Sequence, residues 1–90
     1  MNKADLINSL SEKTGLTKTK SNQVLDALTE AITESLSNGN KVTLVGFGTF
    51  TVSNRNPRKG RNPKTGELID IPAKRVARFR PGTSLNNELN

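Results

Sequence analysis

The sequence predicts an α+β fold: an N-terminal helical hairpin, a three-stranded antiparallel sheet with a long β-ribbon arm, and a short C-terminal helix. Apolar residues recur every three or four positions up to residue 37, as on one face of a helix. From residue 41 the pattern changes to short runs of β-branched residues. Between residues 54 and 74, prolines, glycines and charges replace core-forming side chains, which is typical of an exposed ribbon.

The first helix is predicted over residues 2–13. Asn2 is a favourable N-cap and Asp5 places an acid in the first turn, where it complements the helix dipole. One face carries Leu6, Ile7 and Leu10. Gly15 is the expected stop, because glycine adopts the left-handed conformation that ends many helices.

A second, longer helix is predicted from a Thr17 cap to about Ser37. Asn38-Gly39-Asn40 ends it. The short connection between the two helices predicts a helical hairpin. The apolar stripe of this helix is formed by Val24, Leu25, Leu28, Ala31, Ile32 and Leu36.

Three strands are expected next, at residues 41–45, 49–53 and 75–80, with Gly46-Phe47-Gly48 as the first turn. Phe47 and Phe50 are interpreted as core residues. Pro81-Gly82 breaks the third strand, and Thr83 or Ser84 is expected to cap a short terminal helix that includes Leu85 and Leu89.

Residues 54–74 are interpreted as the arm. Pro57 and Pro72 cannot donate to a ladder, so they fit an exposed edge or a two-stranded ribbon. Residues 62–66 have turn chemistry, with Gly66 suited to a left-handed position. A disordered loop is the alternative. The alternation of Ile69 and Ile71 favours a hairpin, as do the nearly equal lengths of the segments on either side of residues 62–66.

The length of 90 residues predicts one domain, with residues 1–53 and 75–90 as its body and 54–74 as the arm. The apolar fraction is only 31%, and no cysteine or histidine is present to form a disulfide or a typical metal site. We therefore expect no cofactor and no metal, and a second copy of the chain that enlarges the core.

No apolar run is long enough for a membrane span, and no apolar segment behind Met1 suggests a secretory signal. The expected location is therefore the cytoplasm.

Charge is distributed unevenly along the chain. Residues 1–40 carry four basic and five acidic residues, whereas residues 41–90 carry ten basic and three acidic ones. A positive field this local favours a polyanionic partner over a merely solvated surface. The cations of the arm and its root are Arg55, Arg58, Lys59, Arg61, Lys64, Lys74, Arg75, Arg78 and Arg80.

The proposed tip, Arg61-Asn62-Pro63, combines a cation, an amide and a rigid apolar ring. These are the groups that minor-groove proteins use to contact base edges and to enter a base step. Taken alone, Pro63 also fits the simpler role of a turn proline.

Four segments of the chain carry a family resemblance: residues 46–50, 60–67, 71–73 and 79–82. They read Gly-Phe-Gly-Thr-Phe, Gly-Arg-Asn-Pro-Lys-Thr-Gly-Glu, Ile-Pro-Ala and Phe-Arg-Pro-Gly. The chain resembles the HU/IHF family of bacterial histone-like proteins over its whole length. The opening residues and the lack of a C-terminal extension are more similar to homodimeric HU, although residues 79–82 are often found in IHF.

The resemblance implies an intertwined homodimer that binds double-stranded DNA in the nucleoid, with two arms in the minor groove and no small-molecule substrate. Pro63 would be the wedge, with Arg61 and Asn62 beside it in the groove. Lys3 matches a position near flanking DNA. Phosphate contacts would come from Arg55, Arg58, Lys59, Lys64, Lys74, Arg75, Arg78 and Arg80.

The chain departs from the family at two places. Residues 83–88 lack the lysines that many relatives have in the last helix, and Ser53 stands where arginine is common. The first departure leaves the last helix without cations for phosphate contacts, and the second removes a cation from the predicted second strand.

Other function classes fit the residues less well. The chain has no phosphate-binding Gly-Lys-Ser/Thr loop and no carboxylate pair in an apolar setting, so an enzyme is not expected. Three core-like phenylalanines offer no stacking platform for single-stranded RNA. Non-specific DNA bending and chromosome compaction is the preferred function, and site-specific bending of the IHF kind is the alternative.

Overall fold

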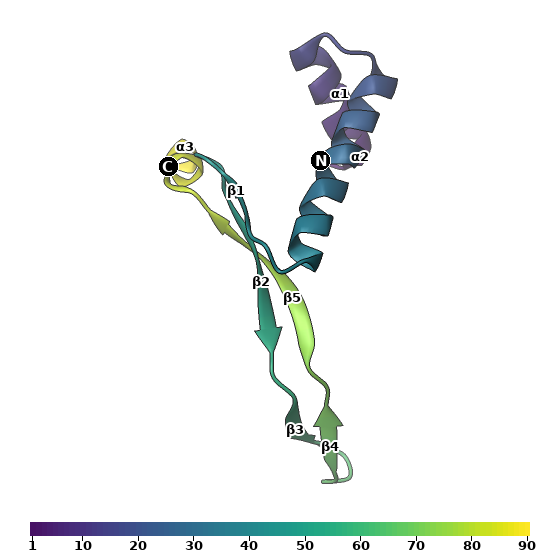
Figure 1. The fold of residues 1–90 in the computed structure, drawn as a ribbon, viewed down its shortest axis with the longest axis vertical. Coiled ribbons are helices and arrows are strands. Elements are labelled where there is room, and N and C mark those ends of the chain that lie inside the picture. The colour runs from purple at the N-terminus through teal and green to yellow at the C-terminus, as the bar shows by residue number, and fades with distance from the viewer. The chain divides into compact units, whose positions relative to one another are not determined.

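The computed structural model describes the backbone of residues 1–90 and every side chain except that of Arg55. Figure 1 traces the chain, and the predicted α+β order of elements is confirmed. Two compact units are formed, Met1–Glu34 and Ser35–Asn90. The elements are α1 (Lys3–Thr14), α2 (Lys18–Ser37), β1 (Val42–Leu44), β2 (Gly48–Arg55), β3 (Arg58–Arg61), β4 (Leu68–Ile71), β5 (Lys74–Pro81) and α3 (Thr83–Leu89).

The helix boundaries follow the predicted caps. The side chain of Asn2 accepts a hydrogen bond from the Asp5 N–H at 3.0 Å, and the Asp5 carboxylate accepts one from the Asn2 N–H at 3.1 Å. Gly15 ends α1 with a left-handed φ of 74°. The Thr17 hydroxyl accepts from the Lys20 N–H at 3.1 Å at the start of α2. Among the described residues, neither helix is long and apolar enough to cross a membrane.

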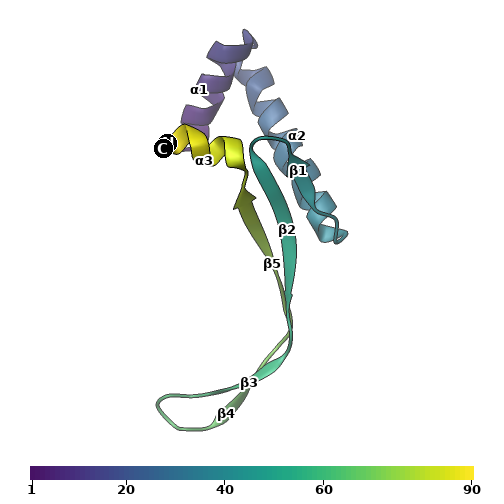
Figure 2. The ribbon, with the colours of Figure 1, turned by 90° about the vertical axis from the view of Figure 1, so that its left-hand side faces the viewer.

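The strands form an antiparallel sheet in the order β1-β2-β5 and a separate two-stranded ribbon of β3 and β4. The β2–β5 ladder runs from Gly48 opposite Pro81 to Arg55 opposite Lys74. The ladder continues beyond the predicted strands and includes both Asn54 and Arg55, because strands β2 and β5 stay in register up to the prolines. Figure 2 shows β2 and β5 leading into β3 and β4, which end in the tip turn.

Three phenylalanine rings cluster on one face of the sheet. The centroid of Phe79 lies 4.8 Å from that of Phe50 and 5.4 Å from that of Phe47. A Cβ at position 48 would lie 2.6 Å from the Phe79 ring and from the Arg80 carbonyl oxygen, so only glycine fits beneath the ring.

The prediction that Phe47 and Phe50 are core residues is wrong for a single chain. Phe47 is 46% exposed and Phe50 is half-buried, because one narrow sheet face cannot enclose three rings. Among all described side chains, no apolar one is buried. On α2, Val24 and Leu28 are about half exposed as well. The apolar stripe of the helix and the apolar face of the sheet therefore remain largely open within one chain.

The predicted cap of the terminal helix is also wrong. The N-cap of α3 is Gly82, and neither Thr83 nor Ser84 caps it through a side chain. The Gly82 N–H donates to the Phe47 carbonyl oxygen at 2.8 Å, and the Leu85 N–H donates to the Gly46 carbonyl oxygen at 3.2 Å. The turn before β2 thus supplies the acceptor that a capping side chain would otherwise provide.

The side chain of Ser21 generates a stability prediction. Ser21 is 1% exposed, and its hydroxyl has no hydrogen-bond partner among the described residues. Ser21→Ala removes a buried, unsatisfied polar group and favours the helix, so we expect the free energy of unfolding to rise by about 1 kcal/mol. Urea denaturation at fixed protein concentration measures this change.

Ser11→Ala is the matched control, because the Ser11 hydroxyl donates to the Leu16 carbonyl oxygen at 2.7 Å. We expect that substitution to lower the free energy of unfolding. A lower unfolding midpoint for Ser21→Ala would show that the hydroxyl is satisfied after all.

Candidate nucleic-acid interface

The two faces of the β2–β5 ribbon differ in chemistry. Residues that lie opposite each other in an antiparallel ladder share a face, and successive pairs alternate between faces. The pairs Thr49–Arg80 and Thr51–Arg78 therefore share one face with Lys74, whereas Phe50–Phe79 and Val52–Ala77 share the other. We call the first the polar face. It carries hydroxyl and guanidinium groups, the Lys74 ammonium and one apolar side chain, Val76, which lies opposite Ser53.

Arg75 does not join the other cations on the polar face. Its register partner is Asn54, on the face that carries the phenylalanines. The Arg75 guanidinium donates from Nη1 to the Ser37 carbonyl oxygen at 2.9 Å. Arg55 is paired in the ladder with Lys74, but its side chain lies outside the described residues.

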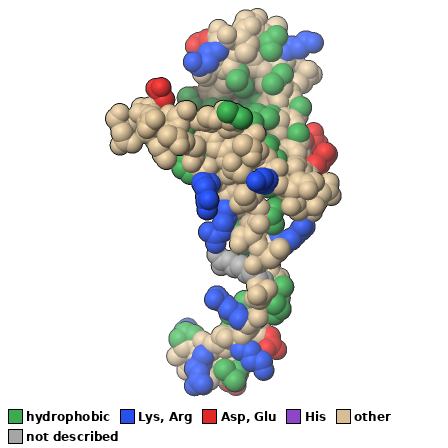
Figure 3. Space-filling model, turned by 60° about the vertical axis from the view of Figure 1, so that its left-hand side comes forward, with side chains coloured by type: hydrophobic (Ala, Val, Ile, Leu, Met, Phe, Trp, Pro, Cys, Tyr) green, Lys and Arg blue, Asp and Glu red, His purple; other side chains and the backbone are tan. Residues whose placement is uncertain are grey.

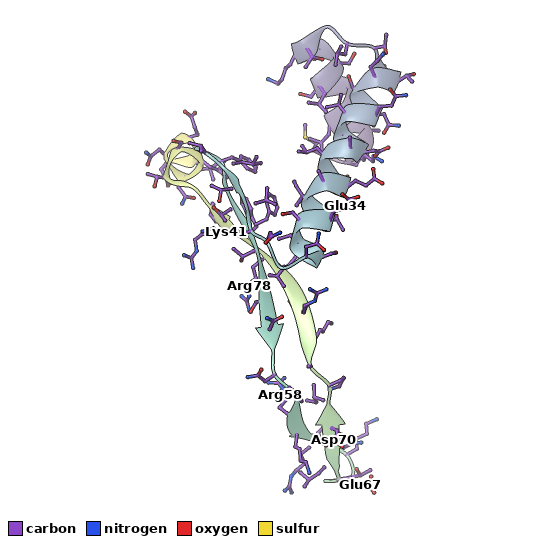
Figure 4. The ribbon with its side chains drawn as sticks, viewed as in Figure 1. Glu34, Lys41, Arg58, Glu67, Asp70 and Arg78 are labelled. Carbon is purple, nitrogen blue, oxygen red and sulfur yellow. The ribbon has the colours of Figure 1, made fainter. Side chains whose placement is uncertain are left out.

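Cations continue along the arm to its tip. Arg58, Lys59, Arg61 and Lys64 are all exposed, as are Lys74, Arg78 and Arg80. Figure 3 shows basic side chains from the sheet to the distal end, and Figure 4 places Arg78 on the sheet and Arg58 on β3. Among the described side chains, none of these cations forms an ion pair, although Asp70 lies opposite Lys59 in the ladder. No salt bridge among the described side chains therefore neutralises any of these cations.

The tip turn holds Pro63 outward. The Asn62 N–H donates to the Glu67 carbonyl oxygen, and the Gly66 N–H donates to the Asn62 carbonyl oxygen, both at 2.8 Å. Gly66 has the predicted left-handed φ, at 74°. The Asn62 side-chain oxygen accepts from the Lys64 N–H at 2.9 Å, which leaves the amide NH₂ as the group of this side chain that is still available to donate. Pro63 is exposed at the apex.

One face of the arm carries Ile69 and Ile71 together with Gly60 and Arg58, their partners in the ladder. The side chains of Ile69 and Ile71 approach Gly60 so closely that a Cβ there would lie 2.9 Å from Ile71 Cδ1. Leu68 lies on the other face, opposite Arg61, and is 64% exposed. Each face of the ribbon therefore carries apolar side chains beside cations.

The ladder is interrupted at the arm root, between the pairs Arg55–Lys74 and Arg58–Ile71. Two residues intervene on each strand, so the register is unchanged and Pro57 lies opposite Pro72. Proline fixes φ at about −65°, whereas an antiparallel strand has a φ of about −140°. An open groove of about 560 Å³ lies here, lined by Asn56, Pro57, Arg58, Ile71, Pro72, Ala73 and Lys74.

Lys3 lies in the other unit, and its ammonium contacts the Asp26 carboxylate at 2.7 Å. The pair is more than half exposed, so it is weak and leaves the ammonium accessible.

The sequence interpretation did not single out Thr43, Thr49 and Thr51 as site residues. Their register positions put them on the polar face, and the Thr49 hydroxyl donates to that of Thr43 at 3.5 Å. The two-residue alternation of Thr49, Thr51 and Ser53 is the signal that identifies this face. No group of three metal-ligating side chains occurs in the described part of the chain.

Comparison with known proteins gives consistent matches over the whole chain. The family model described as "Bacterial DNA-binding protein" matches residues 1–90. DNA-binding protein HU of Geobacillus stearothermophilus is 49% identical, and that of Staphylococcus aureus 51% identical, each over 97% of both chains. The Anabaena HU–DNA cocrystal structure matches with a TM-score of 0.89 and 46% identity, over 99% of this chain and 97% of that chain.

The arm root generates a prediction about hydrogen exchange. Replacing both Pro57 and Pro72 by valine frees φ at both positions, so the ladder can close across the root through the pair Asn56–Ala73. We expect amide exchange at Asn56 and Ala73 in the free protein to slow by about fivefold. Pro63→Val in the tip turn is the control and leaves these two amides unchanged. Unchanged exchange in the double variant would mean that the prolines do not cause the interruption.

Proposed function

The chain belongs to the bacterial DNA-binding protein family, and from this premise we propose that it binds and bends duplex DNA without reading base sequence. The observation that supports this most directly is the run of exposed, unpaired cations from the polar face to the arm tip. Cations that contact phosphates release condensed counterions, which supplies affinity for any sequence. The proposed role is architectural, in the nucleoid of a bacterial cytoplasm, and needs no catalysis.

Each part of the interface has a proposed task. Arg78, Arg80 and Lys74 on the polar face meet phosphates, with the threonine hydroxyls as further donors. Arg58, Lys59 and Lys64, with Arg55, hold the backbone along the arm. Arg61 and the Asn62 amide enter the minor groove. Lys3 contacts flanking DNA once it leaves Asp26.

Pro63 is the proposed wedge. Minor-groove architectural proteins, HU and IHF among them, insert apolar side chains between base steps and kink the duplex. The Pro63 ring is exposed at the apex of a turn that four hydrogen bonds at positions 62–67 hold in shape. A rigid ring on a fixed turn loses little conformational entropy when it enters a base step.

We propose that the acting unit is a homodimer. The chain alone buries no described apolar side chain, and Val24, Leu28, Phe47 and Phe79 are each more than 40% exposed. Surface of this kind requires a covering partner, and a second copy offers the same faces for an isologous interface. Two copies also supply two arms, one for each kink.

The dimer proposal predicts that folding and association are coupled. The thermal unfolding midpoint should rise with protein concentration, because the core forms only between two chains. Calorimetry over a hundredfold range of concentration tests this. A midpoint that does not depend on concentration, with a monomer in light scattering, would contradict the proposal.

The wedge proposal separates binding from bending. Pro63→Ala removes the ring and keeps the cations, so we expect affinity for straight duplex to change by less than about threefold while the bend angle falls. Energy transfer between dyes at the two DNA ends reports the bend. If the bend angle is unchanged, Pro63 only forms the turn.

The double variant Arg58→Ala with Arg61→Ala is the converse test. It should weaken binding to every duplex and reduce the slope of log affinity against log salt by about 0.9 for each phosphate that is no longer neutralised. Titrations at several salt concentrations measure this slope. A slope equal to that of the unsubstituted protein would remove these arginines from the interface.

A further inference from the structure

The C-terminal end of α2 carries a hydrogen-bonded cap that does not satisfy all of its last carbonyl groups. The Asn40 N–H donates to the Ser35 carbonyl oxygen at 2.9 Å, and the Gly39 N–H donates to that of Leu36 at 3.0 Å, with a left-handed Gly39 φ of 82°. This is the Schellman pattern, which satisfies two of the last four helical carbonyls. The Ser37 carbonyl is the next in line and receives no bond from this pattern.

The helix does not compensate its own dipole at this end. Its last turn contains no basic residue, although cations there stabilise the negative end of a helix. Arg75 of β5, which lies 38 residues further along the chain, donates from Nη1 to the Ser37 carbonyl oxygen at 2.9 Å. One guanidinium thus supplies both the missing donor and the missing charge.

The position of Arg75 gives this hydrogen bond a consequence. Arg75 pairs with Asn54, one step before the last pair of the β2–β5 ladder, Arg55 with Lys74. Beyond that pair the ladder is interrupted at the prolines. Arg75 is therefore attached to α2 at the level where the arm leaves the sheet, on the face opposite Arg78 and Arg80.

We infer that Arg75 is a positioning residue: its guanidinium completes the α2 cap and fixes the arm root, and it does not bind phosphate. This inference builds on the proposed DNA binding, because the arm root sets where the arm cations meet the duplex. It replaces the phosphate contact that the family resemblance implied for Arg75. Seven exposed cations of the sheet and arm have no such internal partner among the described residues.

The test compares Arg75→Ala with Arg78→Ala, which removes the same charge from the polar face of the same strand. Amide exchange in the DNA-free protein is the first measurement. We expect Arg75→Ala to speed exchange at Gly39, Asn40 and Asn54 by about three- to tenfold, because the guanidinium no longer joins the capped turn to the ladder end. Arg78→Ala leaves these amides unchanged. Amides in the middle of α1 serve as the internal reference.

The salt dependence of DNA binding is the second measurement. Arg78→Ala should reduce the salt slope by about 0.9 for each protomer, whereas Arg75→Ala should weaken binding a few-fold and leave the slope unchanged. A slope reduced as in Arg78→Ala would make Arg75 a phosphate ligand and overturn the inference. Exchange that is unchanged, or raised equally in α1, would overturn it too. The exchange result stands even if the unsubstituted protein does not bind DNA, so the two proposals fail separately.

Discussion

The antiparallel ladder of β2 with β5, continued by β3 with β4, holds one register from the sheet to the arm tip, and the remaining features depend on it. Facing residues share a side of the ribbon, so the register alone decides which cations act together. A slip of β5 by one position would turn Arg78 and Arg80 to the face that carries Phe50 and would move Phe79 to the polar face. The separation of a polar from an apolar face is thus a property of pairing, and composition does not determine it.

Packing at both ends of the ribbon fixes this register. At the sheet end, the Phe79 ring covers Gly48, and no side chain at that position would fit beneath it. At the distal end, the turn over residues 62–67 is closed by backbone bonds and by the Asn62 side chain. The contact of Phe79 with Gly48 and the turn over residues 62–67 therefore align the two strands of the ribbon, whose pairing is interrupted by prolines in the middle.

Much of the fold could be predicted because its signals are local. The caps at Asn2 and Thr17, the stop at Gly15 and the turn at Gly66 each depend on residues a few positions apart. The cap of α3 could not be predicted, because its acceptors are the carbonyls of Gly46 and Phe47, which become neighbours only in the folded sheet. The candidate site was predicted as a set of cations. The three-residue spacing of Arg75 and Arg78 in the predicted strand already puts them on opposite faces, but the sequence could not show that the Arg75 guanidinium donates to Ser37, 38 residues earlier in the chain.

The burial of Phe47 and Phe50 within one chain could not be predicted for a related reason. Phe47 and Phe50 have the hydrophobicity of core residues, yet burial depends on what covers them, and the pattern of one chain does not specify that. The open stripe on α2 and the open face of the sheet are consistent with a core shared between chains.

The facing prolines at the arm root also affect how the ribbon behaves toward other strands. A two-stranded ribbon has two open edges, and each edge is a template for adding a further strand and for aggregation. At the level of Pro57 and Pro72 neither strand has an N–H to offer, so an added strand would meet a gap in its hydrogen bonding on whichever edge it approached. Mutual repulsion among the cations on either side of this gap acts in the same direction. The arm can therefore extend beyond its sheet without recruiting neighbouring molecules into fibres.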